Sequence, residues 1–236
     1  MRYGTFMMAA VTGSLFLGGA AMASTVTLNV EGLDLEASGP AIASLFTRSD
    51  HRMTNGDLAY LHEELNAAGI NTKRRLTLLT ADTGKGASFI SLVDSRWNSN
   101  NNTMNRLGLT TSSPDSTDFV INDLGDTWDM TNDANGVSHT ANVEFGWRNG
   151  RGDGFAWTDL SGDDVMEFEF ERLAGNGLRN RNAIQVVTFG ASGWEVVDRF
   201  DFGDDGTFGF SVGVIPAPGA LALLGLAGIV SRRRRR

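Results

Sequence analysis

The sequence predicts a mostly β protein: a single antiparallel β-sandwich of jelly-roll type with one short α-helix. Three observations carry this prediction. Apolar and polar residues alternate in many short stretches, turn-forming Gly and Asp residues separate these stretches, and only one segment has a helical period. The 236 residues include 29 Gly and 4 Pro, a composition that suits many tight turns between strands.

The first 23 residues have the three parts of a secretory signal peptide. Arg2 supplies the positive start, residues 6–20 the apolar core, and residues 21–23 a small-x-small cleavage motif. We therefore expect cleavage between Ala23 and Ser24. The Gly and Thr content of the segment argues against the alternative, a true membrane helix.

The elements of the domain follow from residue 25. Residues 25–30 alternate cleanly and predict a first strand, whereas residues 31–53 have no firm period. A helix then begins at Thr54 or Asn55 as N-cap and ends before Gly69. Because its leucines at positions 58, 61 and 65 form one stripe, this helix has to be buried on a sheet.

Strands dominate the rest of the domain. Residues 97–105 and 110–117 are polar and predict connecting segments. The predicted strands cover residues 76–80, 88–93, 119–122, 141–147, 165–171, 183–189 and 194–202. Asp204-Asp205-Gly206 lies between two alternating apolar stretches, residues 200–202 and 208–214, and this pattern predicts a β-hairpin.

The C-terminal segment combines a Pro-x-Pro motif, an apolar run and a basic block. Pro216, Ala217 and Pro218 precede the uncharged residues 219–230, and five arginines follow: Arg232, Arg233, Arg234, Arg235 and Arg236. As a helix, residues 214–230 extend about 26 Å, close to the minimum for a membrane span. We expect the arginines to stay at the cytoplasmic face and stop transfer there.

This arrangement resembles the PEP-CTERM sorting signal of exported bacterial proteins, with Ala217 in place of the middle Glu of the Pro-Glu-Pro motif. The resemblance implies recognition and processing by an exosortase-type membrane enzyme and delivery to the cell envelope. It covers only the tail and implies nothing about the rest of the chain. The predicted organisation is a signal peptide (1–23), an acidic β-sandwich (24–213) and a sorting signal (214–236).

The domain between the two targeting segments is strongly acidic. Arg2 and the five terminal arginines account for six of the 20 basic residues, which leaves 14 basic against 28 acidic side chains and a net charge of −14. Such a surface argues against nucleic acid and against anionic membranes as partners. The absence of Cys excludes cysteine nucleophiles, thiolate metal sites and disulfides.

Two Asp-rich loops are calcium candidates. One contains Asp201, Asp204 and Asp205, and the other covers residues 123–133. Calcium takes six to eight oxygen ligands from flexible loops. Neither loop has the EF-hand spacing, and ordinary turn chemistry also explains Asp and Gly at such positions. No other cofactor is predicted.

Carboxylates and tryptophans offer two further possibilities. Glu167, Glu169 and Glu171 share one strand face, where successive side chains lie ~7 Å apart, so either a glycosidase pair or a solvated face fits. Trp147 and Trp194 are in register with core residues. Trp97, Trp128 and Trp157 lie in or beside predicted loops and could stack on sugars or anchor the core.

No catalytic motif emerges from the sequence. The histidines do not form H-E-x-x-H, and the residues around Ser192 do not form G-x-S-x-G. We therefore predict a non-enzymatic, exported protein of the cell envelope or extracellular matrix, with extracellular polysaccharide as its candidate ligand. The alternative is an extracellular glycan-active enzyme that uses carboxylates such as Glu144, Glu167 and Glu169.

Overall fold

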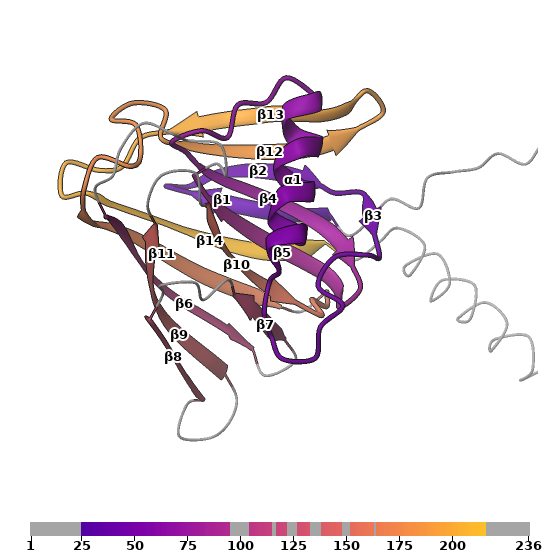
Figure 1. Ribbon diagram of the computed structural model, residues 1–236. Helices are drawn as coiled ribbons and strands as arrows, with labels where there is room; N and C mark the ends of the chain where they lie inside the picture. The colour runs from indigo at the N-terminus through magenta and orange to yellow at the C-terminus, as the bar shows by residue number, and fades with distance from the viewer. Residues whose placement is uncertain are drawn as a thin grey trace, which may run out of the picture.

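The structure is a computed structural model, and it describes residues 25–94, 104–114, 117–121, 127–132, 138–147, 152–162 and 164–215. This part of the chain is mostly β, with two sheets and one helix (Figure 1). The predicted signal peptide with its cleavage site, and the tail from Pro216 onward, lie outside the described residues. Within those residues, no helix has the length and apolar character needed to cross a membrane.

Sheet A is antiparallel throughout. Its order is β2 (Leu33–Ser38), β1 (Thr25–Val30), β14 (Thr207–Ile215), β11 (Val165–Ala174), β6 (Asn105–Pro114), β9 (Ser138–Trp147) and β8 (Thr127–Asn132). Because β14 pairs Val214 with Val26 and Ile215 with Thr25, the sandwich extends two residues beyond the predicted boundary at Gly213.

Sheet B is mixed rather than purely antiparallel. Its order is β13 (Gly193–Phe200), β12 (Ile184–Gly190), β4 (Leu76–Thr83), β5 (Gly86–Val93), β10 (Asp153–Thr158) and β7 (Asp118–Ile121), with β3 (Ala41–Ile42) beside β4. Both β12 and β3 run parallel to β4. Parallel neighbours need long crossover connections, so the local pattern that predicted antiparallel hairpins could not reveal them.

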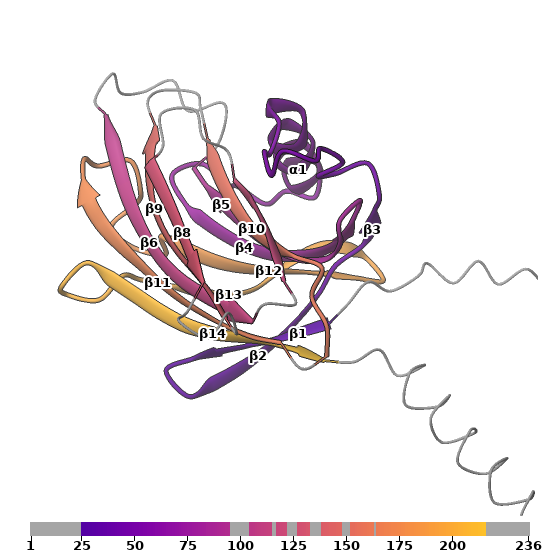
Figure 2. The same cartoon turned by 90° about the horizontal axis from the view of Figure 1, so that it is seen from below.

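Two apolar layers hold the fold together. The inner faces of the two sheets enclose the first, in which Phe89 of sheet B packs edge-on against Phe168 of sheet A, with ring centroids 5.1 Å apart. The second layer lies between sheet B and α1 (Asn55–Ala67). Figure 2 shows α1 on the far side of sheet B from sheet A.

The helix confirms its sequence prediction. Thr54 is the N-cap, and it forms a capping box in which its hydroxyl accepts from the backbone N–H of Asp57 and its own N–H donates to the Asp57 carboxylate. The leucine stripe is buried against sheet B. After Ala67 the chain leaves the helix, and Gly69 has a φ of +78°, a conformation that glycine adopts without strain.

The predicted terminal hairpin is wrong. β13 belongs to sheet B and β14 to sheet A, so the turn at residues 203–206 carries the chain from one sheet to the other. Phe200 and Phe202 still pack on Phe208, with ring centroids 5.7 and 6.4 Å apart. Both sheets face the same core, so apolar alternation on either side of a turn does not distinguish paired strands from strands in opposite sheets.

Other segments also differ from the prediction. The apparently aperiodic residues 31–53 contain β2 and β3, and most of the expected connector at 110–117 lies in β6. In β6, burial alternates along the strand, but the sequence does not alternate between apolar and polar residues. Thr111 and Ser113 occupy inward positions, where they are buried although they are polar. The indole N–H of Trp157 donates to the Thr111 hydroxyl at 2.9 Å, which satisfies both buried groups.

Candidate binding groove on the outer face of sheet A

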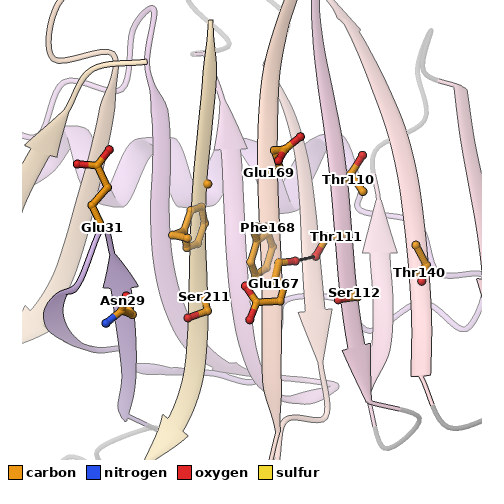
Figure 3. A pocket seen from close by; sticks show the side chains of 12 residues that line it. Asn29, Glu31, Thr110, Thr111, Ser112, Thr140, Glu167, Phe168, Glu169 and Ser211 are labelled. Atoms are coloured by element: carbon orange, nitrogen blue, oxygen red, sulfur yellow. Dashed lines mark hydrogen bonds between the residues drawn. The ribbon is translucent and has the colours of Figure 1, made fainter. Parts of the chain in front are cut away.

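An open groove of about 630 Å³ crosses the outer face of sheet A (Figure 3). It lies over five neighbouring strands, from β1 through β14, β11 and β6 to β9. We call it the sheet A groove. Its polar lining residues are Asn29, Glu31, Thr110, Thr111, Ser112, Thr140, Glu167, Glu169 and Ser211.

Strand alternation places these side chains outside, except that of Thr111, which points inward and contributes only its edge to the lining. On β11, Phe168 is buried in the core while its neighbours Glu167 and Glu169 are exposed. On β14, Phe210 faces the core and Ser211 lies in the groove. Because successive side chains of a strand point to opposite faces, the apolar core of the sandwich also determines which polar groups line the groove.

The register of sheet A then aligns polar residues into one row. Glu167 lies opposite Ser211 on one side and Ser112 on the other. Ser211 in turn lies opposite Asn29, and Ser112 opposite Thr140. Five strands at a spacing of ~4.8 Å make this row about 19 Å long. An amide, three hydroxyls and a carboxylate therefore run across the strands in a line.

Glycine makes the centre of the groove deeper. Gly209 lies opposite Glu169 on the neighbouring strand. A Cβ atom built on Gly209 would meet only the backbone oxygen of Phe168, at 3.7 Å. The position is open because no side chain fills it, and a larger residue there would narrow the groove without a clash.

The groove is acidic. Glu31, Glu167 and Glu169 line it, and its lining contains no Lys or Arg. Among the described residues, neither the Glu167 nor the Glu169 carboxylate forms a hydrogen bond or ion pair, so both remain available to a ligand. Glu144, the third predicted carboxylate, lies outside the lining, and the Arg106 guanidinium donates to it at 2.6 Å.

The Asp-rich turn forms a second hollow beside the groove, of about 420 Å³, which shares Glu31 and Gly209 with it. The three predicted calcium candidates Asp201, Asp204 and Asp205 line this hollow. The Asp205 carboxylate accepts from the backbone N–H of Thr207 at 3.0 Å and from its hydroxyl at 2.8 Å. These bonds lower the pKa of Asp205.

Asp201 is also engaged, since its carboxylate accepts from the backbone N–H of Asn182. Within the part of the chain that the structure describes, no three His, Cys, Asp or Glu residues are grouped so that they could hold a metal ion. The turn bonds of Asp201 and Asp205 agree with the alternative reading of this loop, in which Asp serves turn chemistry. Of the second loop, residues 127–132 form strand β8 rather than a loop, and residues 123–126 and 133 lie outside the described part.

Of the three tryptophans that could form a stacking platform, only Trp157 has a described side chain. Trp147 and Trp194 are buried, as predicted, and Trp157 is fully buried in β10. Trp97 lies outside the described residues, as does the side chain of Trp128. Aromatic stacking by Trp157 is therefore ruled out, and the described side chains that a ligand would meet in the groove are polar.

Comparison of the chain with protein-family models, with curated proteins and with solved structures gave no match. Function has to be inferred from the sheet A groove itself. Sequence reasoning identified Glu167 and Glu169 on their strand face but missed Asn29, Ser211 and Thr140. In the sequence, these three residues can be recognised only as outward positions of alternating strands. Which of them lie side by side in the sheet depends on the pairing of strands that are far apart in the sequence.

Proposed function

We propose that this chain is an exported bacterial envelope or matrix protein that binds polysaccharide in the sheet A groove without chemically altering it. The observation that carries the proposal is the polar row across five strands, centred on Glu167 and open along its length. Sugar hydroxyls can donate to the carboxylates and accept from the amide and hydroxyl side chains of such a row. An open groove also suits a polymer that enters and leaves at both ends.

The charge of the groove narrows the ligand class. Three glutamates line it without a basic residue, and the domain as a whole is acidic. Polymers with carboxylate or sulfate groups along the chain would be repelled from this groove. We therefore propose a neutral polysaccharide, or one that carries amino groups, as the ligand.

The targeting segments support the location that we propose. The signal peptide ending at Ala23 directs export, and the tail from Pro216 to Arg236 has the organisation of a PEP-CTERM sorting signal. β14 ends at Ile215, immediately before the Pro-x-Pro motif. We propose that an exosortase-type enzyme processes the tail after its apolar run has held the protein in the membrane.

We also assign the sandwich to the jelly-roll type. Eight consecutive strands, β5 to β12, support this assignment: each connection except that between β8 and β9 crosses from one sheet to the other. β8 pairs with β9, β7 with β10, and β6 with β11. Such nested pairing around a central hairpin is what a folded-over Greek key produces.

Co-sedimentation of the full-length protein with polysaccharide purified from its host tests the proposal. Glu167→Gln and Glu169→Gln keep the shape of the groove but remove the charge, and each should weaken binding about tenfold. Gly209→Val should abolish binding by filling the groove. Glu171→Gln is the matched control, because Glu171 is exposed on the same strand but outside the groove lining.

Three results bear on the outcome. Equal binding by all four variants would refute the groove as the site, and no binding by the wild type would refute the function. The measurement is repeated with calcium and with a chelator. Calcium-dependent binding would bring the aspartates of the adjacent hollow into the site.

The alternative function is glycan hydrolysis in the same groove. Glu167 and Glu169 are next neighbours on one strand face, ~7 Å apart at the backbone, and inverting glycosidases separate their carboxyl groups by ~6.5–9.5 Å. Release of reducing ends from the polysaccharide by the wild type, abolished in Glu167→Gln, would favour the enzyme. Binding without any release of reducing ends would favour the non-enzymatic role.

A further inference from the structure

Three arginines converge at one end of sheet B, on the other side of the core from the sheet A groove. Arg75 directly precedes β4, Arg179 lies shortly before β12, and Arg199 is near the end of β13. These strand ends lie side by side in Figure 1. The pairing of Gln185 with Arg199 and the hydrogen bond from the Arg179 N–H to the Arg74 carbonyl at 2.9 Å connect them.

Arg75 is the buried member of this group. Only 8% of its surface is exposed, yet within the described part of the chain its side chain has one hydrogen-bond partner, the amide oxygen of Gln185, to which Nη1 donates at 2.9 Å. Nε of Arg75 is buried and has no hydrogen-bond partner among the described residues. Gln185 is itself fixed, because its Nε2 donates to the hydroxyl of Thr77 at 3.0 Å and to the carbonyl of Asn71 at 3.2 Å.

The charge of Arg75 is not compensated. Among the described residues, no carboxylate forms an ion pair with the guanidinium of Arg75, Arg179 or Arg199. Burial lowers the pKa of Arg75, and the positive charges of Arg179 and Arg199 lower it further. A buried charge without a counter-charge is costly, and this one occurs in a domain with twice as many acidic as basic residues.

We infer that Arg75, Arg179 and Arg199 form a binding site for one oxyanion group: a carboxylate, sulfate or phosphate. The guanidinium group suits this ligand class because its planar fork donates two parallel hydrogen bonds to such a group. A hydrogen bond to Gln185 fixes the side chain of Arg75. Arg179 is half-buried and Arg199 is exposed, so an anion can reach these two residues from solvent. The site is separate from the acidic sheet A groove, for which we propose a neutral or amino-bearing polysaccharide rather than an anion.

Equilibrium dialysis of labelled sulfate against the full-length protein tests this inference. We expect saturable binding at one site, with competition by phosphate and by glucuronate. Arg179→Gln and Arg199→Gln should each weaken binding about tenfold or more. Both side chains reach the surface, so their loss should leave the fold intact.

Arg181→Gln is the matched control, because Arg181 is exposed nearby and does not act on Arg75. Glu167→Gln should also bind sulfate as the wild type does, which separates this site from the groove. A polyuronate and free glucuronate are then compared as competitors at equal concentrations of uronate groups. Stronger competition by the polyuronate would identify a polymer as the source of the oxyanion, and equal competition would identify a free anion. Absence of saturable binding, or identical affinities in the Arg179→Gln, Arg199→Gln and Arg181→Gln variants, would overturn the inference.

Discussion

Thr111 of β6 connects the two sheets through one hydroxyl. The indole N–H of Trp157, from sheet B, donates to it at 2.9 Å, and the hydroxyl donates to the Glu167 carbonyl at 2.6 Å. Trp157 is fully buried and Thr111 is 2% exposed. A Thr111→Val substitution keeps the volume and the β-branch but leaves the indole N–H unpaired in the core.

We expect Thr111→Val to lower the free energy of unfolding by about 1.5–4.5 kcal/mol. An unpaired buried donor costs about 1–3 kcal/mol, and the lost bond to the Glu167 carbonyl adds about 0.5–1.5 kcal/mol. Urea denaturation followed by fluorescence measures the change. Thr110→Val is the matched control, because the neighbouring Thr110 is exposed and its substitution should change stability by less than about 0.5 kcal/mol.

A double-mutant cycle with Trp157→Phe isolates the bond between the sheets. The phenylalanine lacks the N–H group, so the cost of Thr111→Val should be about 1–2 kcal/mol smaller in that background. Additive effects of the two substitutions would refute the reasoning. Equal costs for Thr111→Val and Thr110→Val would refute it as well.

Three further predictions concern the turns and the tail. A Cβ atom on Gly39 would lie 1.8 Å from a backbone oxygen of β4, so Gly39→Ala should destabilise the fold by about 3 kcal/mol or more. Gly213→Ala is the control and should be tolerated, because a Cβ atom there would have no other atom within 4 Å. Equal melting temperatures of the two variants would contradict this prediction. Hydrogen bonds from Thr207 lower the pKa of Asp205 below its ordinary 3.8, so the stabilising contribution of Asp205 is complete above the unfolded-state pKa and is lost as the pH falls through the folded one. The stability difference between wild type and Asp205→Asn should thus shrink in acid, and a pH-independent difference would count against it. Replacing residues 232–236 with Gln should reduce membrane retention and C-terminal processing, as seen by fractionation and mass spectrometry, and unchanged processing would argue against the sorting signal.

Local patterns predicted the elements whose cause is local. The α1 helix follows from its N-cap, its leucine stripe and Gly69, and the exposed glutamates of β11 follow from strict alternation with phenylalanine. β6 escaped prediction because Thr111 occupies an inward position, where a partner 46 residues away satisfies its hydroxyl. A buried polar residue looks the same in sequence as a solvated one.

The candidate site was only partly predictable for the same reason. The sequence places Glu167 and Glu169 on an outer face of their strand. The polar row that extends from Asn29 to Thr140 and forms the groove follows only from the register of five strands. That register is determined by long-range pairing. The hydrogen bond of the buried Arg75 is likewise made to a distant residue, Gln185, which lies 110 residues along the chain.

Carboxyl footprinting of the full-length protein, with and without saturating host polysaccharide, tests most directly whether sheet A binds the polymer. A water-soluble carbodiimide labels exposed carboxylates, and mass spectrometry reports each site. We predict that bound polymer protects Glu167 and Glu169 while Glu171 on sheet A and Glu195 on sheet B react as before. Unchanged labelling of Glu167 and Glu169 in a complex that demonstrably forms would contradict the proposed groove.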